Sequence, residues 1–137
     1  MGVVTELLRS EADGKVSFGN YELDKKAKLE DFPHGGDLLK VKTFAEITKL
    51  EKNGLFVYES VPGTAVCGFE ETAEGVSFTV SGKEDAQITL GLAEDTLYEI
   101  FIGGECTGAV KTGLGGKLSV SVELAGVESL DVKVCKA

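Results

Sequence analysis

The feature that most constrains the fold is a strict alternation of apolar and polar residues in the segment KLSVSVEL, residues 117–124. Successive side chains of an extended chain point to opposite faces, so the apolar residues share one face and the serines share the other. This pattern is typical of a strand with one face in a core and one face in water. The same period of two recurs at residues 76–81 and 130–135, and we expect a strand at each.

Further short runs rich in β-branched and aromatic residues bring the number of strands expected in this part of the chain to about seven. They cover residues 64–70, 86–91, 97–102 and 107–111. Glycines, of which the chain has 18, fall between the runs, as expected for turns that join strands. The pattern predicts an all-β protein in which residues 63–137 form an immunoglobulin-like or jelly-roll-like β-sandwich, with at most one short helix in the whole chain.

The preceding segment, residues 1–62, is predicted to be an N-terminal β-hairpin layer or subdomain. Residues 6–21 indicate a hairpin about Asp13-Gly14, because an Asp-Gly pair supplies the positive φ angles that a tight primed turn needs. Residues 22–37 are more polar and are interrupted by Pro33, which favours a connection or a peripheral strand. We expect both segments to form one compact unit.

Residues 43–53 allow two interpretations. Thr43 and Glu46 have the spacing of a capping box, and Asn53-Gly54 could end a short helix. An Asn-Gly pair between β-prone residues is also the strongest short-range signal of a hairpin, and LFVYESV directly follows it. We favour the hairpin.

A two-residue hairpin at this point would place Leu50 opposite Val57, Lys49 opposite Tyr58 and Glu51 opposite Phe56. One face would then be aliphatic and the other would carry two aromatic rings among charges. The rings could pack beneath another layer of the same chain, or they could form an exposed patch used for self-association. The candidate self-association residues are Phe56, Tyr58, Leu55 and Val57.

Residues with catalytic chemistry are sparse. His34 is the only histidine, so a metal site built on two histidines is excluded. Cys67, Cys106 and Cys135 are odd in number and have no C-x-x-C spacing, which argues against a disulfide framework or a structural zinc site and for reduced thiols. We therefore predict no catalytic residue, no metal ligand and no cofactor.

The net charge of −9 is concentrated in residues 63–137, where 12 acidic and 5 basic residues give −7. Arg9 is the only arginine, so bidentate recognition of phosphate or carboxylate is nearly absent. Nucleic acids and anionic membranes are therefore expected to be poor partners. The opening segment MGVVTELLRSEADG has no apolar stretch as long as a signal peptide or a membrane span, so we expect a cytoplasmic protein.

Four segments carry a resemblance to a known group of proteins: SFGNYEL, KVKTFAEITKLEKNGLFVYESVPGTAV, GVSFTVSGKEDAQITLGL and TGLGGKLSVSVEL. Together they resemble short clostridial-type proteins that carry the label endosialidase. Residues 84–124 are also similar to the immunoglobulin-like modules of polysaccharide-processing enzymes. The label implies a site that holds a sugar carboxylate with clustered arginines, and a chain with a single arginine cannot build that cluster.

These observations favour a non-catalytic structural protein that associates with itself into a homo-oligomer or a larger assembly. A strand that is apolar on both faces, such as residues 55–61, must be covered twice, and a second copy can provide the cover. The alternative is a carbohydrate-associated binding module, with Tyr21, Tyr58 and Tyr98 as candidate sugar platforms. A glycosidase, as the label implies, is the third hypothesis.

Overall fold

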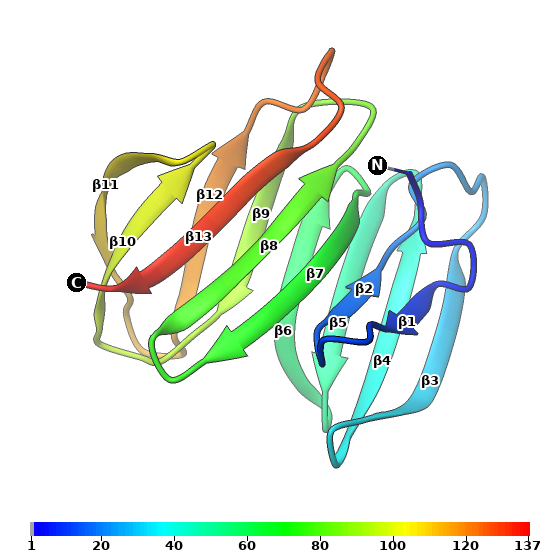
Figure 1. The fold of residues 1–137 in the computed structure, drawn as a ribbon, viewed down its shortest axis with the longest axis horizontal. Coiled ribbons are helices and arrows are strands. Elements are labelled where there is room, and N and C mark those ends of the chain that lie inside the picture. Colours follow the sequence, from blue (N-terminus) through cyan, green and yellow to red (C-terminus); the bar gives the residue numbers. More distant parts are fainter. Residues whose placement is uncertain (1) are drawn as a thin grey trace.

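The computed structural model describes residues 2–137, which contain thirteen strands and no helix. The strands form two antiparallel sheets that lie face to face as an unclosed β-sandwich (Figure 1). The structure confirms the all-β sandwich predicted from the sequence. The sequence prediction succeeds because most strands alternate buried and exposed residues, as at KLSVSV, where every second residue is buried.

The first sheet, sheet A, has seven strands. Their spatial order is β1 (Leu8–Ser10), β2 (Val16–Phe18), β7 (Ala65–Thr72), β8 (Gly75–Ser81), β13 (Leu130–Lys136), β10 (Leu97–Ile102) and β11 (Glu105–Lys111).

Sheet B has six strands, in the order β12 (Lys117–Val122), β9 (Ala86–Gly91), β6 (Leu55–Val61), β5 (Ile47–Lys52), β4 (Asp37–Phe44) and β3 (Ala27–His34). The segments 1–62 and 63–137 each contribute strands to both sheets. β11 and β12 are edge strands, and β3 lies at the opposite edge of sheet B from β12 (Figure 1).

The core between the sheets is centred on an aromatic cluster of Phe18, Tyr58, Phe69 and Phe78. Tyr58 extends from sheet B into the three phenylalanines of sheet A and meets each ring edge to face, with centroids 5.2, 6.3 and 5.6 Å away. Edge-to-face contacts of this kind add to the free energy of burying the rings. Aliphatic side chains from both sheets surround the cluster.

The N-terminal elements follow the turn chemistry of the sequence. Asp13-Gly14 closes the hairpin between β1 and β2, and Gly14 has the expected positive φ of 88°. Residues 43–53 form strands and not a helix: β4 pairs with β5, and Asn53-Gly54 joins β5 to β6 with φ angles of 52° and 79°. The hairpin interpretation is confirmed, and residues 27–34 form a peripheral strand.

The predicted register of the β5–β6 hairpin is only partly right. Glu51 does lie opposite Phe56, but Leu50 lies opposite Tyr58 and not Val57. A bulge leaves Val57 as the extra residue, so Tyr58 turns to the opposite face from Phe56. The predicted face with two aromatic rings is therefore wrong, because Val57 and Tyr58 are both buried in the core.

Candidate functional site

The four residues proposed from the sequence for self-association do not form one surface. Val57 and Tyr58 are buried, while Phe56 lies half-buried on the outer face of sheet B. The ammonium groups of Lys117 and Lys49 lie 4.9 and 5.9 Å from the centroid of the Phe56 ring. Leu55 is 70% exposed beside the turn between β5 and β6.

Tyr58 is held by a buried chain of hydroxyl groups. Its phenol lies 2.7 Å from Thr64 Oγ1, which lies 2.8 Å from Ser60 Oγ. Thr48 Oγ1 donates to the carbonyl oxygen of Thr64 and accepts from its backbone N–H. Burial raises the pKa of the Tyr58 phenol well above its ordinary value. Tyr58 is therefore a neutral structural residue, which has no exposed surface to offer a sugar.

The other two candidate sugar platforms differ in exposure. Tyr98 is buried, and its hydroxyl oxygen accepts a hydrogen bond of 3.1 Å from the backbone N–H of Ala93. Tyr21 is half-buried in the connection between β2 and β3. Of the three tyrosines, only Tyr21 presents part of its ring to solvent.

His34 is engaged at both ring nitrogens. Nε2 lies 3.1 Å from the carbonyl oxygen of Gly14, and Nδ1 lies 2.8 Å from Ser10 Oγ. Because a carbonyl oxygen can only accept, Nε2 carries the proton of that contact. The ring thus links the end of β3 to the β1–β2 hairpin of the other sheet, and this arrangement gives His34 a structural role.

The described residues, 2–137, contain no group of three or more His, Cys, Asp or Glu side chains arranged to hold a metal ion. Cys67, Cys106 and Cys135 are free thiols. The sulfur of Cys106 is exposed and lies 4.0 Å from a carboxylate oxygen of Glu99.

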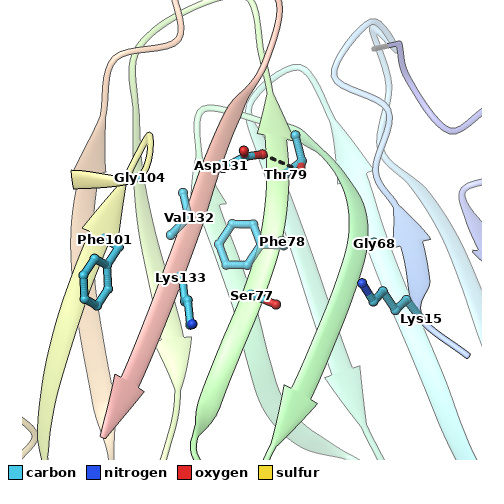
Figure 2. Close-up of a pocket in the computed structure, with 10 residues that line it drawn as sticks. All are labelled: Lys15, Gly68, Ser77, Phe78, Thr79, Phe101, Gly104, Asp131, Val132 and Lys133. Atoms are coloured by element: carbon cyan, nitrogen blue, oxygen red, sulfur yellow. Dashed lines mark hydrogen bonds between the residues drawn. The ribbon is translucent and has the colours of Figure 1, made fainter. Parts of the chain in front are cut away.

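A shallow depression of about 450 Å³ opens on the outer face of sheet A. Figure 2 shows that it lies over β8, β13 and β10, with Phe101 on one side and Lys15 on the other. Thr79 donates a hydrogen bond of 2.9 Å to Asp131 on its floor, and Lys133 is the neighbouring cation. The depression can contact a small polar molecule, but the groups that line it do not enclose one.

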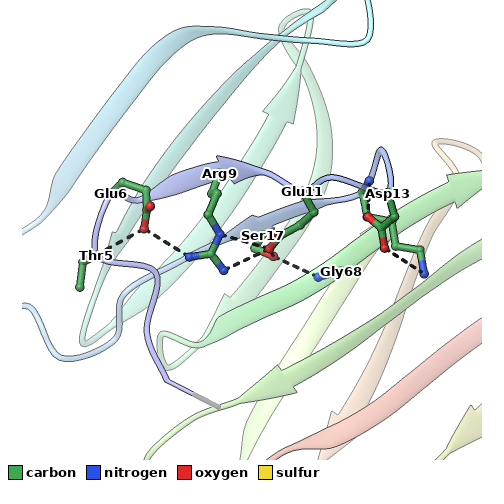
Figure 3. A network of polar contacts seen from close by, with 8 residues as sticks. Thr5, Glu6, Arg9, Glu11, Asp13, Ser17 and Gly68 are labelled. Atoms are coloured by element: carbon green, nitrogen blue, oxygen red, sulfur yellow. Dashed lines mark hydrogen bonds and ion pairs between the residues drawn. The ribbon is translucent and has the colours of Figure 1, made fainter.

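Arg9 is committed to a local network that joins β1, β2 and β7 (Figure 3). Its guanidinium donates to Glu11 Oε2 at 3.1 and 3.2 Å. Ser17 donates to the same carboxylate oxygen, and the backbone N–H of Gly68 donates to Ser17 Oγ at 3.1 Å. The hydrogen bond from Ser17 and then that from Arg9 lower the pKa of Glu11. The only arginine therefore organises the fold at this edge.

The open edge formed by β11 and β12 is the strongest candidate for a functional surface. β11 pairs with β10 alone, and all seven of its residues are exposed, so neither face of the strand is covered. In Figure 1 β11 forms the outermost strand at one end of the molecule. Its second row of backbone N–H and C=O groups has no strand partner among residues 2–137.

An apolar groove of about 290 Å³ lies between β10 and β11 of one sheet and β12 of the other. Ile100 and Ile102 form one wall, Val120 forms the opposite wall, and Val110 lies at the mouth. Val110 is 43% exposed although it pairs with the buried Tyr98 and so faces the inner side of the sheet. The sandwich is thus left open along this edge, with core side chains at the bottom of the groove.

Sequence reasoning missed this edge. Residues 107–111 were predicted to be a strand, but an isolated strand pattern does not show whether another layer covers it. The one available signal is the absence of a large apolar residue from ECTGAVK apart from Val110, since strands covered on a face carry several.

Comparison with protein family models, with curated protein sequences and with solved structures finds no match. The residues that the structure describes include no helix that is long and apolar enough to cross a bilayer.

Proposed function

We propose that this chain is a non-catalytic structural protein that associates with itself through β11, the uncovered edge strand of sheet A. The observation that carries the proposal is the exposure of all seven β11 residues beside an apolar groove. A free, extended edge is a template for another strand, and a second copy of the same chain supplies one of matching length.

The charges of β11 favour pairing with itself. Glu105 and Lys111 stand at its two ends, and Gly108 stands at its centre. An antiparallel pair centred on Gly108 would bring the end of β11 that carries Glu105 beside the end of the partner strand that carries Lys111, and the symmetry would repeat that contact. The bulge at Thr107 turns Glu105 to the inner side of the sheet while Lys111 faces the outer side, so the two charges meet at the strand ends and not on one face. Opposite charges at adjoining strand ends attract each other, so this edge is complementary to itself.

The same pairing would cover the groove. Val110 lies on the inner side of β11 and would be brought to the groove of the partner copy, above Ile100, Ile102 and Val120. Removal of this apolar surface from water provides the non-directional part of the association free energy. The backbone hydrogen bonds and the attraction between the charged strand ends favour the antiparallel alignment.

Substitution of Val110 tests the groove. We expect Val110→Lys to raise the dimer dissociation constant by at least about tenfold, because an ammonium group would lose its hydration in an apolar groove. The control is Val127→Lys, since Val127 is 46% exposed in the loop between β12 and β13 and lies outside β11 and β12. Light scattering of both variants measures the effect. An equal response of the two variants would contradict the proposed surface.

Exchange of the two β11 charges tests the pairing itself. Glu105→Lys would bring two lysines together at both ends of the pair and weaken the dimer. The double variant Glu105→Lys, Lys111→Glu would restore opposite charges across the dyad and recover association. Because Lys111 also pairs with exposed Asp95 at 3.3 Å, the double variant is compared with Lys111→Glu alone. Failure of the exchange to recover the dimer would exclude this register.

A further inference from the structure

A second surface, on the outer face of sheet B, has the opposite charge from the rest of the molecule. Lys28 of β3, Lys42 of β4 and Lys49 of β5 lie directly opposite one another in the sheet register. Neighbouring strands are about 4.8 Å apart, so the three side chains form one cationic row across the sheet. Lys26 lies beside the row, two residues before Lys28, with its ammonium group 5.9 Å from the ring centroid of Phe44. We call these four lysines the lysine patch.

The lysine patch contains little compensating charge. Glu59, opposite Lys49 on β6, is the only carboxylate in the same cross-strand row. The four lysines and Glu59 carry a formal charge of +3, so the remainder of the chain carries −12, since the whole carries −9. Lys40, beside the patch, is balanced by Glu30 at 3.6 Å and lies opposite Glu51.

The fold gains nothing from this arrangement. Like charges directly opposite each other destabilise a sheet. The positive charge of Lys26 lowers the pKa of Lys42 most, followed by desolvation and then by the charges of Lys28, Lys49 and Lys40. Because the ammonium group of Lys42 is exposed, solvent keeps the cost small. A negatively charged partner would turn this repulsion into attraction.

The geometry points to the surface of an anionic lipid bilayer, and we propose that the lysine patch docks there. None of the hollows described above is lined by a patch lysine, so the patch does not enclose a small anion. Lysines act as point charges without the fixed fork of arginine, which suits lipid headgroups that can move beneath them. Leu38 and Val61 lie on the same outer face and are half exposed, at 50% and 54%, so they can enter the headgroup region.

A bilayer also suits the distribution of charge over the whole molecule. A planar surface contacts the outer face of sheet B only and keeps the carboxylates on the outer face of sheet A, across a core about 10 Å thick, beyond the screening distance of about 8 Å at physiological ionic strength. A long soluble polyanion, or a second copy of this chain, would bring its own negative charge against that remainder. The observations therefore favour the bilayer over those partners.

Vesicle sedimentation with a matched pair of variants tests the proposal. We expect the wild-type protein to bind vesicles that contain about one third phosphatidylserine in phosphatidylcholine, and not vesicles of phosphatidylcholine alone. The triple variant Lys28→Gln, Lys42→Gln, Lys49→Gln should lose at least about tenfold in affinity for the anionic vesicles, and about 0.5 M salt should have a similar effect. The triple variant Lys83→Gln, Lys133→Gln, Lys136→Gln changes the net charge equally and should bind like the wild type.

Three results would overturn the proposal. The first is no binding of the wild type to anionic vesicles. The second is an equal loss of binding in the two triple variants, which would show an effect of net charge alone. The third is a patch variant that changes only the oligomeric mass, or only the binding of an oligonucleotide used as a soluble polyanion, which would assign the patch to another partner. Vesicle binding does not depend on β11, so the proposal stands or fails separately from self-association.

Discussion

At the scale of single residues, the buried hydroxyl chain around Thr64 shows how this sandwich fills its core with polar groups at little cost. Thr48 uses its hydroxyl to donate to the Thr64 carbonyl and to accept from the Thr64 N–H. Tyr58 and Ser60 both contact Thr64 Oγ1, and Thr43 Oγ1 extends the chain from Thr48. Buried polar groups that are all paired stabilise a unique arrangement, whereas one missing member leaves its partner unsatisfied.

The first prediction at this scale concerns the Tyr58 hydroxyl. We expect Tyr58→Phe to lower the free energy of unfolding by about 1–2 kcal/mol, because the ring stays packed while Thr64 loses a hydrogen-bond partner in a water-free site. Tyr21→Phe removes the same atom from a half-buried ring and is expected to change stability by less than about 0.5 kcal/mol. Urea unfolding of both variants measures the difference. Equal effects would mean that the chain of hydroxyl groups does not stabilise the fold.

At the scale of elements, the strands follow local patterns while their pairings do not. KLSVSVEL and the runs at 76–81, 86–91, 97–102 and 130–135 predicted strands because alternation is a property of each segment alone. The bulge at Val57 could not be read from LFVYESV, since a run that is apolar on both faces is compatible with either register. The candidate pair Phe56 and Tyr58 was therefore placed on one face when the structure separates them.

The uncovered edge was hidden for a related reason. Which strands become edges depends on pairings between distant segments, such as β13 inserted between β8 and β10. Val110 and Ile100 alternate like any core residues, and only the order of strands in the two sheets shows that no layer covers β11. The sequence could thus predict that the chain is a sandwich, and could suggest self-association, but it could not identify the surface.

The attachment of the short β1–β2 hairpin to β7 gives a prediction about pH. Hydrogen bonds from Ser17 and then from Arg9 lower the pKa of Glu11 in the folded protein. The ionised carboxylate therefore stabilises the fold fully above the unfolded pKa of about 4.5, and this stabilisation is lost as the pH falls through the folded pKa. We expect Glu11→Gln to be less stable than the wild type at neutral pH, with a difference that shrinks below about pH 4.5.

Chemical unfolding at several pH values measures that difference. Ser17→Ala provides the comparison, because it removes the largest cause of the pKa shift of Glu11 and should also reduce the dependence on pH. A difference between the wild type and Glu11→Gln that stays constant down to about pH 3 would show that the carboxylate charge at this position does not stabilise the hairpin.

At the scale of the whole molecule, the place of the charges and of the strand edges on the surface is more informative than the net charge or the number of strands. The net charge of −9 led us to expect that anionic membranes are poor partners, but that expectation averages over all faces. The structure separates the lysine patch, with its single Glu59, from a remainder of −12. It also brings together β11, an edge strand of sheet A, and β12, the edge strand of sheet B opposite β3, on the two sides of the groove. The two surfaces lie on different parts of the sandwich and can act independently.

The central claim is that β11 associates with β11 of a second copy, and the most direct measurement is the mass of the wild-type protein by light scattering over a concentration series. The account predicts that the mass rises toward twice the chain mass of 14.4 kDa, or toward a larger even multiple, and that Val110→Lys shifts the rise to higher concentration. A constant mass of 14.4 kDa up to roughly 100 µM would contradict it, because a functional contact of this kind should have a dissociation constant well below that concentration.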